Sequence, residues 1–130
     1  MTIEERLEQI RITESRRIFA ELVEKSYKKP LKTDIGDMSS FYDRFLNKCN
    51  PNNHDNNRIF AFIAFFVYDP ASLIHKRVTR GDVRKEVSKV LGVSVSAVTR
   101  QVADGKFLFL HHKGFKKEVE RVFAAMTEES

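Results

Sequence analysis

Apolar residues between positions 82 and 102 fall into two stripes with helical spacing. Those of the first stripe are Val83, Val87, Val90 and Leu91, and those of the second are Val95, Val98 and Val102. Steps of three and four residues place side chains on one face of a helix. Gly92 stands between the stripes, where a glycine can adopt the left-handed conformation that ends a helix. The pattern predicts two short helices joined at Gly92, the second capped by Ser94 or Ser96.

The same spacing predicts further helices upstream. Thr2 and Glu5 have the spacing of a capping box, and a helical arm is expected over residues 1–28, ending before Pro30. Residues 29–40 contain proline, glycine and hydroxyl side chains and are the expected linker. A short helix is then expected from Ser39 or Ser40, with three residues facing inward: Phe41, Phe45 and Leu46.

The segment from Ile59 to Tyr68 is apolar on every face and is therefore expected at the centre of the fold. Periodicity alone allows a buried helix or a buried strand. Its two alanines and the helical patterns on both sides favour a helix. Asp69-Pro70 is expected to end this helix and to begin another.

Downstream of the helix pair, Asp104-Gly105 is expected to close the second helix. The apolar run of residues 107–110 is a candidate extended segment, and Lys113-Gly114 is expected to turn the chain into a last helix. That helix has a stripe of apolar residues: Phe115, Val119, Val122, Phe123 and Met126. The predicted fold class is all-α, a compact helical domain over residues 41–126 with the helix pair at 82–103.

Positive charge is concentrated around the helix pair. Residues 1–75 carry 11 Lys and Arg against 11 Asp and Glu, whereas residues 76–121 carry 12 against 5, a net charge of +7. A basic field confined to one segment suits phosphate binding, because cations that displace counterions supply most non-specific affinity for nucleic acid. A solvated basic surface with no ligand would have the same composition.

The helix pair resembles the helix-turn-helix DNA-binding proteins, in particular lac-type repressors and phage or mobile-element regulators. The likeness rests on Gly92-Val93-Ser94 followed by Val98-Thr99-Arg100, and it covers about twenty of the 130 residues. Upstream, Val87, Ser88 and Leu91 fill the matching apolar and small positions. Gln101 departs from the apolar residue that is usual in the family, and Val102 follows it. Either the helix is rotated slightly to bury Val102, or the likeness is superficial.

The resemblance implies that the second helix enters the major groove of double-stranded DNA. Arg100 is then the main base-reading residue, since Arg pairs bidentately with guanine. The other expected base contacts are Ser94, Ser96, Thr99 and Gln101. The expected phosphate contacts are Arg84, Lys85, Lys89, Lys106 and Lys113. By analogy with this family we expect a regulator of transcription or a mobile-element accessory factor that acts as a homodimer, with the N-terminal helices as the candidate interface.

The rival hypothesis is an all-helical module that binds an acidic protein or RNA, with the helix pair serving only to pack the core. Arg100 discriminates between the two. An ion pair with Asp104, one turn further along the helix, would favour the module, and a free Arg100 beside Ser96 would favour DNA binding.

Catalysis is the function that the sequence supports least. It contains no glycine-rich phosphate loop, no His-Glu-x-x-His pair and no nucleophile elbow. Cys49 and His54 are too few for a zinc site, and no cofactor, metal or small-molecule substrate is expected. Cys49 is the only cysteine, and the longest apolar run has ten residues. Both features point to a cytoplasmic protein that does not span a membrane.

Overall fold

The computed structural model describes residues 2–6, 38–73 and 81–128. Its helices are α3 (Met38–Lys48), α4 (Asn56–Tyr68), the 3-10 helix η3 (Pro70–Leu73), α5 (Gly81–Leu91), α6 (Val95–His111) and α7 (Lys113–Glu128). No strand occurs in these three ranges. The predicted all-α fold class is therefore confirmed.

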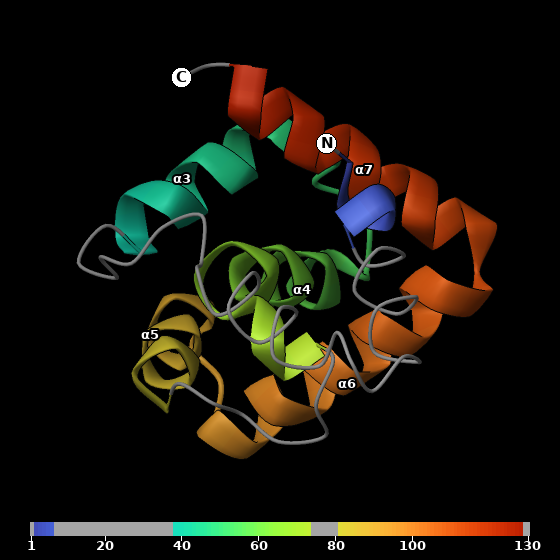
Figure 1. Cartoon of the computed structure of the whole chain (residues 1–130). Helices are drawn as coiled ribbons and strands as arrows, with labels where there is room; N and C mark the ends of the chain where they lie inside the picture. Colours follow the sequence, from blue (N-terminus) through green and yellow to red (C-terminus); the bar gives the residue numbers. More distant parts are fainter. Residues whose placement is uncertain (1, 7–37, 74–80, 129–130) are drawn as a thin grey trace, which may run out of the picture.

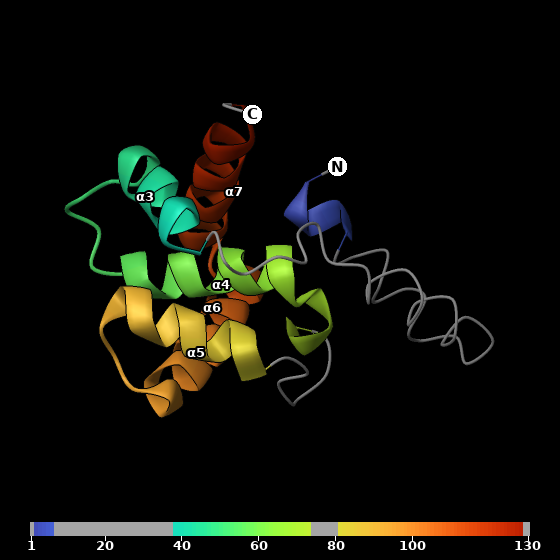
Figure 2. The same cartoon turned by 90° about the vertical axis from the view of Figure 1, so that its left-hand side faces the viewer.

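Helix α4 forms the centre of the fold. Its ten residues from Ile59 to Tyr68 are at most 4% exposed. In Figures 1 and 2, α4 lies between α3 and α7 on one side and α5 and α6 on the other. A segment that is apolar on every face needs neighbours on every side, and these helices provide them. The prediction of a helix rather than a strand for this segment is confirmed, and Asp69 ends it as expected, with its N–H bonded to the carbonyl of Phe65.

Aromatic side chains hold the outer helices on α4. The ring of Phe41 on α3 meets Tyr68 edge to face at 5.5 Å, and Phe66 meets Phe123 of α7 in the same way at 5.3 Å. Phe62 stacks on Phe109 of α6 at 4.9 Å. Each such pair stabilises the packing by about 1 kcal/mol beyond the burial of its apolar area.

Helix α6 is longer than its sequence pattern predicts. It runs without interruption through Asp104-Gly105, so the expected helix end at this dipeptide and the candidate extended segment at residues 107–110 are both wrong. The glycine has a tertiary role instead: a Cβ on Gly105 would lie 3.1 Å from the carbonyl oxygen of Arg58 on α4. Gly105 therefore permits a close crossing of two helices and does not end one.

Helix α3 begins at Met38, which is 1% exposed, so residues 38–40 of the expected linker form its first turn. Phe41 and Phe45 face the core as predicted, but Leu46 is 49% exposed and the prediction for it is wrong. The helices that pack against α3 cover the side that carries the two phenylalanines.

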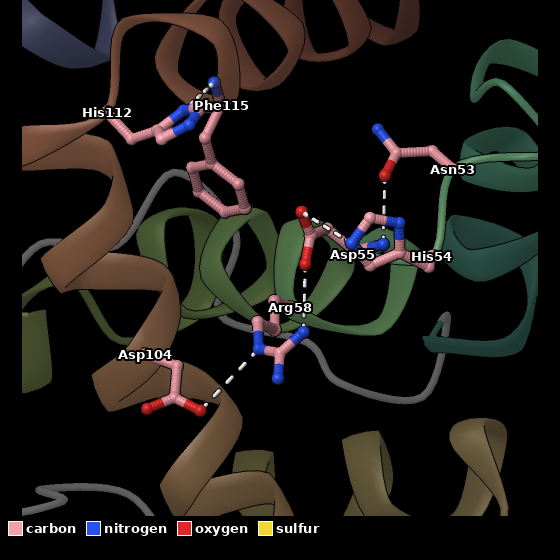
Figure 3. A network of polar contacts seen from close by, with 7 residues as sticks. All are labelled: Asn53, His54, Asp55, Arg58, Asp104, His112 and Phe115. Carbon is pink, nitrogen blue, oxygen red and sulfur yellow. Dashed lines mark hydrogen bonds and ion pairs between the residues drawn. The ribbon is translucent and has the colours of Figure 1, made fainter.

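The last helix has the predicted inner stripe. Phe115, Val119, Val122 and Met126 of α7 are buried, and Phe123 is half-buried against them. The helix starts directly after α6, where Nδ1 of His112 accepts a hydrogen bond from the N–H of Phe115 at 3.1 Å (Figure 3). This bond satisfies one of the free donors of the first turn.

Residues 2–6 pack against α7. The Thr2 hydroxyl accepts from the N–H of Glu5 at 3.0 Å, and the Glu5 carboxylate accepts from the N–H of Thr2 at 3.4 Å, which confirms the capping box. Ile3 is fully buried, and Glu4 pairs with Lys116. The rest of the expected arm, and most of the expected linker, lie outside the described residues.

Candidate nucleic-acid interface

The candidate interface is built on the turn between α5 and α6. Gly92 has a φ of +67°, as its place after the apolar stripe predicted. Its N–H donates to the carbonyl of Lys89 at 3.3 Å, and the N–H of Val93 donates to the carbonyl of Ser88 at 3.2 Å. This pair of bonds is a Schellman motif, which satisfies the last carbonyls of α5 and directs the chain into α6.

The first turn of α6 is capped from within the same turn. The Ser94 hydroxyl accepts from the N–H of Ala97 at 3.0 Å, so Ser94 and not Ser96 is the N-cap. The Ser88 hydroxyl of α5 donates to the carbonyl of Val93. Arg84 of α5 donates to the Thr99 hydroxyl of α6 at 3.3 Å. The Arg84–Thr99 bond thus joins the two helices, and the Ser88 bond ties α5 to the turn between them.

Helix α6 has a buried side and an exposed side. Val98 and Val102 are buried, and Ser96, Thr99 and Arg100 are exposed. Gln101 is half-buried, and its Oε1 is shielded from solvent without a hydrogen-bond partner. Where the helix-turn-helix pattern has an apolar residue, this chain has Gln101. Here Val102 is the buried apolar residue instead, and the amide of Gln101 lies at the edge of the buried side of α6.

The five predicted base-contact residues differ in whether their polar groups are exposed or already hydrogen-bonded within the protein. Ser96 and Arg100 are exposed four residues apart on one side of α6. The hydroxyl of Ser94 is used in the cap, and that of Thr99 is held between Arg84 and the carbonyl of Val95. The structure brings Ser96, Thr99 and Arg100 together and turns part of Gln101 inward.

Asp104, the expected intramolecular partner of Arg100, is engaged elsewhere. Its Oδ2 lies 3.5 Å from Nε of Arg58, and Nη1 of Arg58 lies 2.8 Å from Oδ1 of Asp55 (Figure 3). Among the described residues, Arg100 forms no ion pair.

The five predicted phosphate contacts differ in how exposed their side chains are. Lys85 and Lys113 are exposed, and Lys89 is exposed beside Glu86, with 3.2 Å between Nζ and Oε1. Arg84 is half-buried and bonded to Thr99, and Lys106 is half-buried. Lys85, Lys89 and Lys113 are therefore the most accessible of the five.

The sequence pattern missed the exposed residues that follow Arg100 on α6. These are Ala103, Phe107, Leu110 and His111. Phe107 is 62% exposed and Leu110 39% exposed. A signal was present, since Ser96, Arg100, Ala103, Phe107 and Leu110 follow one another in steps of four and three residues, which puts them on one side of a continuous helix. Reading Asp104-Gly105 as a helix end hid it.

The residues considered for metal binding do not converge. His54 faces solvent beside Asp55, with 3.8 Å between Nε2 and Oδ2, and the Cys49 thiol donates to the carbonyl of Leu46 at 3.6 Å. Burial raises the pKa of the Cys49 thiol, which lowers its thiolate fraction. No group of three or more His, Cys, Asp or Glu suited to a metal ion occurs within the described ranges.

Comparison with known proteins gave no match to a protein-family model, a curated protein or a solved structure. In the part of the chain that the structure describes, no helix has the length and apolar character needed to cross a membrane.

Proposed function

We propose that this chain is a sequence-reading double-stranded DNA-binding protein, a small regulator or a phage or mobile-element accessory factor. The N-terminal half of α6 enters the major groove, Arg100 pairs with a base edge, and Ser96 makes a secondary contact. Thr99 holds Arg84 and supports the position of the helix.

The exposure of Arg100 without an ion pair among the described residues carries this proposal. A guanidinium that already holds a carboxylate must give up that partner to bind a base. Here Asp104, the expected partner one turn further along the helix, is paired with Arg58. Arg100 is also set on a helix whose orientation is fixed by the Gly92 turn and the Arg84–Thr99 bond.

Charge supports the same proposal. The net charge of +7 over residues 76–121 falls on the segment that contains α5, α6 and the start of α7. Lys85, Lys89 and Lys113 are the expected phosphate contacts that fix register without reading sequence.

A homodimer is part of the proposal because one helix-turn-helix buries little area on DNA. In this scheme two copies place their α6 helices in major-groove segments about 34 Å apart. A DNA-reading role and a single free cysteine both fit a cytoplasmic location.

The test is fluorescence anisotropy of a labelled mixed-sequence duplex with the wild type, Arg100→Ala and Arg121→Ala at a low and a high salt concentration. Arg121 is the matched control, since it is exposed, lies on α7 and pairs with Glu118. We expect binding that weakens steeply with salt. Arg100→Ala should lower affinity or erase sequence preference, by about tenfold for one bidentate base contact.

Equal effects of the two substitutions would mean that Arg100 contributes only charge, and base reading by α6 would be wrong. Absence of binding at low salt would overturn the DNA-binding function and favour the rival interaction module. The observation that favours that module is the exposure of Leu46, Phe107 and Leu110, because exposed apolar side chains often mark protein contacts.

A further inference from the structure

The exposed side of α6 changes from polar to apolar beyond Arg100. Its first half carries Ser96, Thr99 and Arg100, and its second half carries Ala103, Phe107 and Leu110. Because α6 is continuous through Gly105, both halves lie on one uninterrupted helix. The seven residues from Arg100 to Phe107 span about 10 Å along the axis and almost two full turns, so the two side chains point to the same side.

Phe107 is held in an exposed position. The residue is 62% exposed, and the centroid of its ring lies 4.7 Å from that of His111, one turn further on, with an angle of 44° between the planes. Leaving a phenylalanine in water forgoes roughly 2 kcal/mol of apolar burial. A ring in this position is therefore available for an apolar contact with a ligand.

The charge on this side of α6 favours an anionic occupant. Asp104 is the only acidic residue in the sequence of α6, and it is paired with Arg58. A second copy docked through the same side would bring two basic segments together, which is unfavourable. A duplex that contacts Arg100 would instead continue along the helix toward Phe107 without meeting a free carboxylate of α6.

Thymine offers the apolar group that such a side chain can contact in the major groove, its C5-methyl. We propose that Phe107, with Ala103 beside it, reads thymine methyl groups next to the base that Arg100 contacts. The inference rests on the proposed function and deepens it, since it assigns a second specificity-determining position. The thymine should lie within about three base pairs of the base read by Arg100, given the 10 Å offset and a rise of about 3.4 Å per base pair.

The experiment uses the full chain and a pool of random duplexes enriched by rounds of binding to the wild type. The enriched pool is then synthesised in two forms, one with thymine and one with uracil, which differ only in the C5-methyl. Affinity for both forms is measured by anisotropy for the wild type, Phe107→Ser and Leu46→Ser. Leu46 is the control because it is an exposed apolar residue, at 49%, on another helix.

We expect the wild type and Leu46→Ser to bind the thymine form more tightly, by about fourfold for each methyl group contacted. Phe107→Ser should bind the thymine form more weakly than the wild type and should not distinguish the two forms. Circular dichroism of each variant checks that it is folded.

Other outcomes distinguish a failure of the thymine contact from a failure of DNA binding itself. If sequences are enriched but the wild type binds the thymine and uracil forms equally well, the thymine contact is wrong and DNA reading stands. Failure to enrich any sequence overturns DNA reading and the inference together. Sedimentation velocity adds a further check: a wild-type dimer that Phe107→Ser converts to a monomer would assign this side of α6 to a second copy, against the inference.

Discussion

Gly105 of α6 faces the backbone carbonyl of Arg58 on α4 where the two helices cross. A Cβ on Gly105 would lie 3.1 Å from the Arg58 carbonyl oxygen and 3.3 Å from Cβ of Phe62. The close approach also lets Phe62 stack on Phe109, one turn beyond the glycine. The position of α6, and so of Arg100, depends on this crossing.

We predict that Gly105→Ala destabilises the fold by about 1 kcal/mol. Alanine gains about 1 kcal/mol of helix propensity over glycine, but the tight contact with a backbone oxygen costs about 2 kcal/mol because helix α4 cannot move aside without loss of packing. Urea denaturation followed by circular dichroism measures the change as a lower midpoint at constant slope.

Gly81→Ala is the matched control for this substitution. Gly81 begins α5, and a Cβ there meets no atom within 4 Å. We expect this variant to be as stable as the wild type or slightly more stable. A Gly105→Ala variant that gained stability like Gly81→Ala would show that the helix crossing has room for a methyl group.

Gly92→Ala should cost about 1 kcal/mol for a different reason. No atom lies within 4 Å of a Cβ at Gly92, so space is not limiting, but its φ of +67° is unfavourable for an L-residue with a Cβ. Gly92→Asn should cost less, because asparagine adopts this conformation more readily than alanine. Thermal unfolding of the three proteins gives the order, and equal losses for both variants would contradict it.

Elements that depend on residues close together in the sequence could be predicted from the sequence pattern. The Gly92 turn follows from two apolar stripes and one glycine, and the capping box of Thr2 and Glu5 follows from its spacing. The helix over residues 59–68 could be predicted because its helical context outweighed an ambiguous period. The exposure of Arg100 also follows from the stripe that buries Val98 and Val102.

Features that depend on distant partners could not be predicted in the same way. Gly105 has the sequence context of a helix end, and only the closeness of Arg58 and Phe62 of α4 explains why a glycine stands inside a continuous helix. The engagement of Asp104 by Arg58 joins residues 46 positions apart. The exposure of Leu46 depends on which side of α3 its neighbouring helices cover.

Glu118 gives a prediction about pH. Hydrogen bonds from Arg121 hold the pKa of the Glu118 carboxyl below its ordinary value of about 4.3, with burial acting against them and the charge of Arg121 acting with them. A lowered folded-state pKa means stability that is present above about pH 4.3 and is lost as the pH falls toward the folded pKa. Because the Arg121 side chain is exposed to solvent, the contribution of this pair is below about 1 kcal/mol.

An NMR titration of the Glu118 carboxyl measures this pKa directly. We expect a value below the ordinary range in the wild type and a rise toward it in Arg121→Gln, which keeps a polar side chain but removes the charge. The acid limb of a urea-stability curve should be shallower in that variant. An unchanged pKa in Arg121→Gln would contradict the assigned cause.

Gln101 links stability to the proposed reading of DNA. Its Oε1 is shielded from solvent and lacks a hydrogen-bond partner, which costs about 1–3 kcal/mol for a buried acceptor. We predict that Gln101→Leu raises the free energy of unfolding by about 1 kcal/mol, because an apolar side chain of similar size removes that cost and extends the Val98–Val102 stripe. Gln101→Ala removes the amide without filling its volume and should gain less. If the half-buried amide also reads a base, the Gln101→Leu variant should be more stable than the wild type but less selective among duplexes. A Gln101→Leu variant that is less stable than the wild type would show that the amide oxygen is hydrogen-bonded in solution.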